Sequence, residues 1–115
     1  MTPIGKPLTP SLYWCYSTYM KGTLIFHQKS KIHDHYVLEL EIFEIEDPVR
    51  YPDRIKYSLI CLNSKTGQKV LFDNHHPKGH HLHLDNRERP YHFRSVPTLM
   101  ADFVALISKH LGIKI

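Results

Sequence analysis

Residues 35–46 constrain the fold more than any other segment, because apolar and acidic residues alternate in them with a period of two. The segment reads HYVLELEIFEIE. Successive side chains of a β-strand point to opposite faces of its sheet, so this pattern predicts a long antiparallel strand with one buried face. The glutamates are expected to face solvent, and a second layer must cover the apolar side. The residues expected on the covered side are Tyr36, Leu38, Leu40 and Ile42.

The segments around this strand also resemble strands. The run TLIFHQ follows Gly22 and is rich in β-branched and aromatic residues, and a polar turn is expected at residues 29–34. The motif DPVRYPD, with its two prolines, ends the long strand. The runs RIKYSLICL and KVLFD flank a polar loop that contains Gly67, which predicts a β-hairpin with a longer loop.

The strands continue after this hairpin. Pro77 and Gly79 indicate a loop over residues 75–79, and HLHL at residues 81–84 alternates as a short strand does. The motif DNRERP is expected to form a turn, and YHFR, residues 91–94, is expected to return as a last short strand.

The last segment of the chain is predicted to form an amphipathic helix. Ser95 is the expected N-cap, and Pro97 suits the first helical turn. Gly112 is placed to end the helix, after a lysine and a histidine whose charge suits the negative end of the helix dipole. Residues at three- and four-residue spacing form its apolar side: Leu99, Met100, Phe103, Val104, Ile107 and Leu111.

Strands followed by one helix, without alternation of the two, predict an α+β fold: an antiparallel sheet of about five strands with one C-terminal helix packed across a face. We expect a single domain, residues 1–115, in which residues 1–11 form a loose N-terminal arm. Residues 12–20 are compatible with an edge strand or a short amphipathic helix, and we favour irregular or strand structure there.

Composition narrows the class of protein. Hydrophobic residues make up 42% of the chain and charged residues 23%, which are values of globular domains. Cys15 and Cys61 are too isolated to suggest a disulfide framework, so we expect reduced cysteines in a cytoplasmic protein. No run of 18 apolar residues is present, so no membrane association is expected. The net charge of +4 favours a partner that carries phosphate or carboxylate groups, and an acidic protein fits equally well.

The candidate site lies in residues 73–94, which hold six of the ten histidines. Imidazole titrates near neutral pH, so such a density indicates proton transfer, metal ligation or phosphate contact. In the HLHL strand His81 and His83 are expected on one face and His80 on the other. Histidines outside this segment, and the glutamates of residues 35–46, are expected to be structural or solvated: His27, His33, His35 and His110, with Glu39, Glu41, Glu44 and Glu46.

Two chemistries fit the cluster. Metal binding has enough donors in His75, His76, His80, His81 and His83 with Asp73 and Asp85, but the spacing matches no named zinc motif. Metal-free RNA cleavage needs an acid, a base and cations to hold phosphate. For single histidines of a polar loop, plain solvation remains the simplest interpretation. No cofactor is required, and affinity for a divalent metal remains open.

The segment RIKYSLICLNSKTGQKVLFDN, the histidine run and the helix that begins VPTL together resemble the TumE family of toxins, from small toxin-antitoxin modules. The resemblance covers residues 54–107. It implies a growth-inhibiting toxin aimed at RNA, with a cognate antitoxin partner that often has a helix-turn-helix fold. In this chain two histidines precede the proline, whereas the family more usually places its pair after it. The matching positions are Phe72, Asp73, Asn74, Pro77, His80, His81 and His83.

Two hypotheses follow. The first is a toxin-type ribonuclease, and the alternative is a non-catalytic module that binds nucleic acid or protein and holds a metal in its histidine cluster. Homo-oligomerisation stays open in both. For the ribonuclease, the expected catalytic residues are His76, His80, His81 and His83, with Asp73 to orient an imidazole; Lys78 and Arg94 are expected to hold phosphate and Tyr91 to stack on a base.

Overall fold

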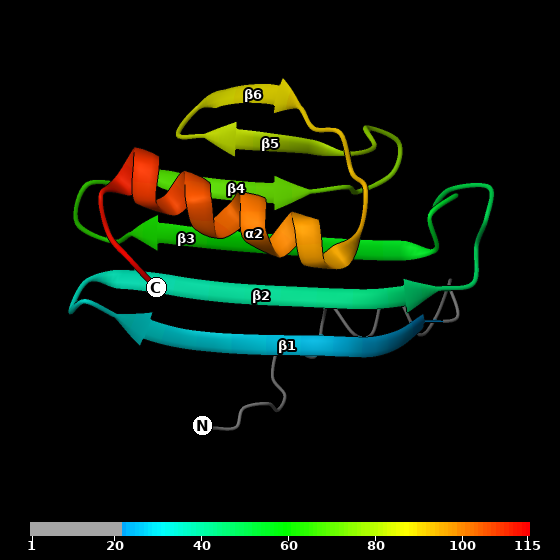
Figure 1. Cartoon of the computed structure of the whole chain (residues 1–115), viewed down its shortest axis with the longest axis horizontal. Coiled ribbons are helices and arrows are strands. Elements are labelled where there is room, and N and C mark those ends of the chain that lie inside the picture. Colours follow the sequence, from blue (N-terminus) through cyan, green and yellow to red (C-terminus); the bar gives the residue numbers. More distant parts are fainter. Residues whose placement is uncertain (1–21) are drawn as a thin grey trace.

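The computed structural model describes residues 22–115. The expected arm at residues 1–11, the segment 12–20 and Cys15 therefore lie outside the described residues. In the described part, six strands form one sheet in the order β1-β2-β3-β4-β5-β6, and each pairs antiparallel with its neighbour (Figure 1). The strands are β1 (Gly22–Ile32), β2 (Tyr36–Ile45), β3 (Ile55–Asn63), β4 (Lys69–Asp73), β5 (His81–Leu84) and β6 (Arg87–Pro90).

The alternation in β2 is confirmed on its apolar side, but Glu41, which was expected to face solvent, is buried with 4% of its surface exposed. The even-numbered apolar residues of β2 are buried and face the core, where Leu40 lies opposite Leu59 of β3. Tyr57, Leu59 and Cys61 of β3 have no exposed surface, and Cys61 is a free thiol whose pKa is raised by burial. The predicted hairpin between β3 and β4 is also confirmed, because Gly67 adopts the positive φ of 82° that favours glycine in its loop.

The second layer is the C-terminal helix α2 (Val96–Leu106), which lies across β3 and β4 in Figure 1 and continues into the π-helical turn η1 (Ile107–Leu111). Ser95 caps it as predicted, because its side-chain oxygen accepts the Thr98 N–H at 3.2 Å. Leu99, Phe103 and Ile107 are fully buried on the sheet. The α+β prediction is therefore confirmed, with six strands in place of about five.

The end of the helix is also as predicted, with one exception on its apolar side. Gly112 ends η1 with φ of 73°, the left-handed conformation of a C-terminal cap. Val104 was expected against the sheet but keeps 39% of its surface exposed. The helix covers only part of the sheet. Leu99, Phe103 and Ile107 form the side of the helix that packs against it, and Val104 lies outside this side.

Strand β1 is longer than predicted. The polar run expected to be a turn belongs to the strand, which continues to Ile32. The turn instead falls at His33 and Asp34, both with positive φ. Lys29 lies opposite Glu39 in the β1–β2 register, so a lysine of β1 faces an acidic residue of β2. This cross-strand pairing explains why a polar sequence forms a strand here.

The last strand lies earlier than predicted. Arg87–Pro90 forms β6, whereas residues 91–94, expected as the strand, have no regular structure. Leu84 pairs with Arg87, so Asp85 and Asn86 alone make the turn, and Asp85 has φ of 58°. Aspartate and asparagine tolerate this conformation, which allows a tight two-residue hairpin. Pro90 is accommodated because β6 is an edge strand.

The sheet has two faces with different chemistry. One face packs against α2, and the other, which we call the far face, points away from it. Strand pairing aligns one row of residues across the far face, in which each residue is the register partner of the next. The row consists of His27, Glu41, Ser58, Asp73 and His81.

Candidate functional site

A pair of histidines occupies the far face of β5. Leu82 and Leu84 of this strand turn toward the core, so alternation directs His81 and His83 to the far face, as the sequence indicates. Their ring centroids are 5.0 Å apart and the ring planes meet at 74°. His81 is buried and His83 is partly exposed. Two imidazoles thus lie side by side in different environments.

A backbone carbonyl determines which ring nitrogen of His81 carries a proton. His81 Nδ1 lies 2.8 Å from the carbonyl oxygen of Gly79. A carbonyl only accepts hydrogen bonds, so Nδ1 carries the proton and donates. In the neutral ring Nε2 then has a free lone pair. This arrangement orients the ring and leaves one nitrogen for proton transfer.

Asp73 and His75 adjoin this pair. Asp73 is the cross-strand partner of His81 in the β4–β5 register. Its Oδ1 accepts the backbone N–H of His75 at 2.7 Å, which holds the start of the following loop against the end of β4. Strand pairing therefore places Asp73 and His81 opposite each other on the far face.

Lys56 is the residue of this site that the sequence reasoning missed. It comes from β3, is buried, and its Nζ lies 3.8 Å from Asp73 Oδ1. Burial lowers the pKa of this ammonium, while the carboxylates of Asp73 and Glu41 act in the opposite direction. The sequence did contain a sign of this. Lys56 and Ser58 are two residues apart and therefore share the face of β3 opposite to Tyr57, and Ser58 is the register partner of Asp73.

Two imidazoles of the site have lowered pKa values. For His83 the first cause is burial, followed by the neighbouring His81. For His75 the first cause is again burial, followed by the Lys56 ammonium. Both effects penalise the charged form, so these rings favour the neutral state near pH 7. We call Lys56, Asp73, His75, His81 and His83 the far-face cluster.

Lys78 lies at the margin of this cluster. Its Nζ is 2.7 Å from Glu88 Oε1, and Glu88 is the cross-strand partner of His83. The hydrogen bond from Lys78 is the main cause of the lowered pKa of Glu88. A cavity of about 270 Å³ opens here, lined by Lys78, His80, His81, Glu88, Arg89 and Pro90.

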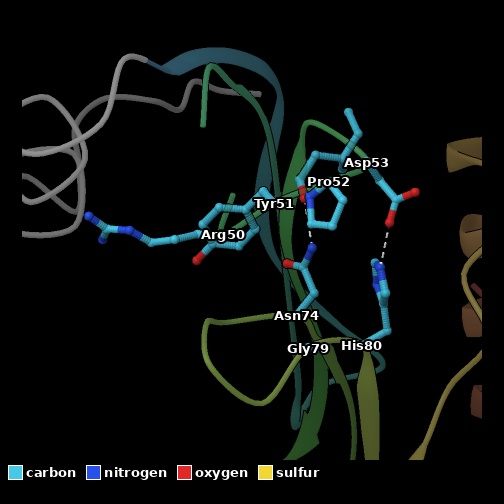
Figure 2. A pocket seen from close by; sticks show the side chains of 8 residues that line it. Arg50, Tyr51, Pro52, Asp53, Asn74, Gly79 and His80 are labelled. Carbon is cyan, nitrogen blue, oxygen red and sulfur yellow. Dashed lines mark hydrogen bonds and ion pairs between the residues drawn. The ribbon is translucent and has the colours of Figure 1, made fainter. Parts of the chain in front are cut away.

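His80 lies on the opposite side of the sheet from His81. Its Nε2 is 2.8 Å from Asp53 Oδ2, and its Nδ1 is 2.9 Å from Tyr57 Oη (Figure 2 shows the contact with Asp53). Because a carboxylate accepts, Nε2 carries the proton, and Nδ1 accepts the Tyr57 hydroxyl. Burial raises the pKa of Tyr57, which keeps that hydroxyl protonated. The His80 ring also stacks on Phe93, with centroids 4.9 Å apart. Both nitrogens of this ring are thus engaged.

A cavity of about 160 Å³ lies beside His80 and is shown in Figure 2. Asn74 holds one of its walls: Oδ1 accepts the Tyr57 N–H at 2.9 Å, and Nδ2 donates to the Ile55 carbonyl at 2.6 Å. These two bonds tie the end of β4 to the start of β3. The cavity is lined by Arg50, Tyr51, Pro52, Asp53, Ile55, Asn74, Gly79 and His80.

Of the remaining candidate residues, Tyr91 and Arg94 lie apart from the far-face cluster, and His76 follows His75 in the loop after β4. Tyr91 Oη donates to Asp102 Oδ2 at 2.6 Å, and an Arg94 nitrogen lies 3.6 Å from the same oxygen, so both are tied to α2. Burial and the contact with Asp102 raise the pKa of Tyr91. His76 is exposed in the loop after β4, and its backbone N–H donates to Tyr51 Oη. Of the expected set, strand geometry thus assembles Asp73, His81 and His83, with Lys78 nearby.

The far-face cluster does not form a compact metal site. Within residues 22–115, the only group of three histidine, cysteine or carboxylate residues with donor atoms within 4.8 Å of one another lies elsewhere, on β1 and β2. The histidines of β5 suit proton transfer better than ligation by three or more donors.

The fold and site define an α+β protein with paired imidazoles on the far face of an antiparallel sheet. The chain belongs to a toxin family: the family model described as Toxin TumE matches residues 16–111. This match is longer than the segment in which the sequence itself shows the resemblance. Neither the curated proteins nor the solved structures include a match. Among the residues that the structure describes, no helix has the length and apolar character needed to cross a membrane.

Proposed function

We propose that this chain is the toxin of a toxin-antitoxin pair and that it cleaves RNA by acid–base catalysis at the far-face cluster. The observation that carries the proposal is the His81–His83 pair, whose rings are 5.0 Å apart beside Asp73 and the buried Lys56. Membership of a toxin family supports the biological role. The net charge of +4 favours a phosphate-bearing substrate.

The chemistry divides between the two imidazoles. His83, whose pKa is lowered, is the base that takes the 2′-hydroxyl proton of the RNA. The 2′-oxygen attacks phosphorus, and the bond to the 5′-oxygen breaks. His81 protonates that leaving oxygen from Nε2, while Gly79 holds its Nδ1–H. The RNA products are a 2′,3′-cyclic phosphate and a free 5′-hydroxyl.

The charged neighbours support these steps. Asp73, opposite His81 on β4, places a carboxylate on the same face of the sheet as the donating ring. Lys56 supplies a positive charge at a position that burial fixes, next to Asp73, and Lys78 supplies a second one at the rim of the cavity. Both positive charges stabilise the additional negative charge that develops on the phosphate in the transition state.

The partner in this proposal is a cognate antitoxin, and a helix-turn-helix protein is the expected type. Such a protein neutralises the toxin by binding to it. Co-expression with the product of a neighbouring small gene tests this part: restored growth and a complex that survives gel filtration are expected.

The catalytic part is tested with His81→Ala and His83→Ala. Each is expected to lower RNA cleavage by about 10²-fold or more, the usual contribution of a positioned acid or base, and to relieve growth inhibition. His92→Ala is the matched control, because His92 is exposed and lies outside the cluster. Circular dichroism establishes that all three variants fold.

Three further outcomes decide the proposal. Cleavage by untagged wild-type protein should persist in chelator, since the mechanism uses no metal. If both alanine variants cleave RNA as the wild type does, the assignment of this site is wrong. If purified wild-type protein binds RNA and leaves it intact, the chain is a binding module and not a nuclease.

A further inference from the structure

A second group of polar side chains lies on the far face, at the β1–β2 pair. His27 of β1 is the cross-strand partner of Glu41, and Glu39 precedes Glu41 by two residues on the same face of β2. His27 Nε2 lies 3.7 Å from a Glu41 oxygen and 3.9 Å from a Glu39 oxygen. We propose that His27, Glu39 and Glu41 bind one divalent transition-metal ion.

The burial of Glu41 differs from the sequence expectation, in which the glutamates of residues 35–46 were solvated, whereas His27 was expected to be structural or on the surface. The side chains of His27 and Glu41 each retain only 5% of their exposure, and that of Glu39 retains 26%. One nitrogen of His27 and one oxygen from each glutamate lie within 4.8 Å of one another, so the three side chains offer their donor atoms to a common point. Lys56 acts on Glu41 from the β3 side, and a metal ion would supply further positive charge from the β1 side.

The spacing of the donor atoms favours an ion between them. Nitrogen and oxygen that share a hydrogen bond lie about 2.7 to 3.2 Å apart, so the two separations from His27 exceed a direct bond. Ligands that bind one zinc ion at about 2.1 Å, in tetrahedral geometry, lie about 3.4 Å from each other. The observed 3.7 and 3.9 Å exceed this by a few tenths of an ångström. Small rotations of the carboxylates close that difference.

The donor set selects the class of ion. Imidazole suits zinc and other first-row transition ions, whereas Mg²⁺ and Ca²⁺ take oxygen ligands almost alone. One imidazole with two carboxylates therefore fits Zn²⁺ or Mn²⁺. Bidentate binding by the more exposed Glu39, or a water molecule, would complete the coordination.

This site is separate from the proposed nuclease site. Glu41 on β2 and Asp73 on β4 both pair with Ser58 of the strand between them, so two strand spacings, about 10 Å, separate them. The ion would bind β1 to β2 and would take no part in RNA cleavage. The metal site can therefore be tested whether or not the chain is a nuclease.

The test is calorimetric titration of the untagged full chain with Zn²⁺, Mn²⁺ and, for comparison, Mg²⁺. One tight equivalent of Zn²⁺ or Mn²⁺ is expected, with Mg²⁺ far weaker. Glu39→Gln removes one charged ligand at the most exposed of the three positions and should weaken the tight equivalent by about 10- to 100-fold or more. Glu44→Gln, an exposed position on the same strand, is the matched control and should bind as the wild type does.

Thermal melting gives a second readout. Zn²⁺ should raise the Tm of the wild type and of Glu44→Gln, and raise it much less in Glu39→Gln. His83→Ala controls for binding by the other histidines and should keep the tight equivalent. The proposal is overturned if the wild type binds no tight equivalent, or if Glu39→Gln keeps it while His83→Ala loses it.

Discussion

His80 and His81 are consecutive in the chain, yet their side chains lie on opposite faces of the sheet. His80 accepts the Tyr57 hydroxyl and stacks on Phe93, on the side of α2. His81 lies on the far face, opposite Asp73 and next to His83. A shift of one residue in the β5 register would exchange the two environments, so the register of this strand decides which imidazole reaches the candidate site.

The first prediction separates these neighbours by stability. His80→Ala removes two hydrogen bonds and an aromatic stack, so we expect it to lower the free energy of unfolding by about 1 to 3 kcal/mol. His81→Ala removes a single hydrogen bond, to the Gly79 carbonyl, so it should lower the free energy of unfolding by less. Urea denaturation of both variants measures the difference. A larger loss for His81→Ala would contradict the structural role of His80.

The second prediction concerns Asn74, which donates to one backbone group and accepts from another. Asn74→Asp keeps the oxygen that accepts the Tyr57 N–H but places a second oxygen against the Ile55 carbonyl. Because the side chain is buried, we expect a loss of about 1 to 3 kcal/mol of unfolding free energy. Asn86→Asp, in the exposed β5–β6 turn, is the control and should change stability little. Equal stability of both variants would show that the two bonds to Asn74 contribute nothing.

Much of this fold could be predicted because its signals are local. The alternation in β2, the glycine in the β3–β4 loop and the Ser95 cap each act within a few residues, and each is confirmed. The errors arose where pairing between strands overrides local polarity. Lysines of β1 and arginines of β6 look like turn residues in isolation, but a neighbouring strand gives their backbone groups partners.

The candidate site was predictable only in part, for the same reason. Alternation places His81 and His83 on one face, so their proximity follows from sequence alone. Lys56 and Glu41 come from other strands, and their burial beside Asp73 and His27 depends on the registers of three strand pairs. Tyr91 and Arg94 are close to the cluster in sequence, but the contacts with Asp102 draw them to α2.

The third prediction tests the buried cation. Lys56→Met nearly keeps the length of the side chain and removes its charge. We expect the rate of RNA cleavage to fall at least about tenfold, because the negative charge of the transition state is then no longer stabilised by this ammonium group. Lys56→Arg, which keeps the charge, should retain more activity. Lys65→Met controls for net charge, because Lys65 lies exposed in the β3–β4 loop. Equal cleavage by Lys56→Met and Lys65→Met would exclude Lys56 from the mechanism.

The last prediction is a dependence of stability on pH. The pKa values of His75 and His83 in the folded protein lie below the ordinary value of 6.5, chiefly through burial. Below that pH the unfolded chain therefore binds more protons at these two positions than the folded chain does, so stability rises with pH in this window and falls as pH drops below 6.5. The contribution of both rings is fully present above pH 6.5. We expect the Tm of the wild type to decrease from pH 7 to pH 5, and to decrease less steeply in His83→Gln. His92→Gln, with an exposed ring, should follow the wild type, and a His83→Gln profile parallel to the wild type would show that His83 does not carry this effect.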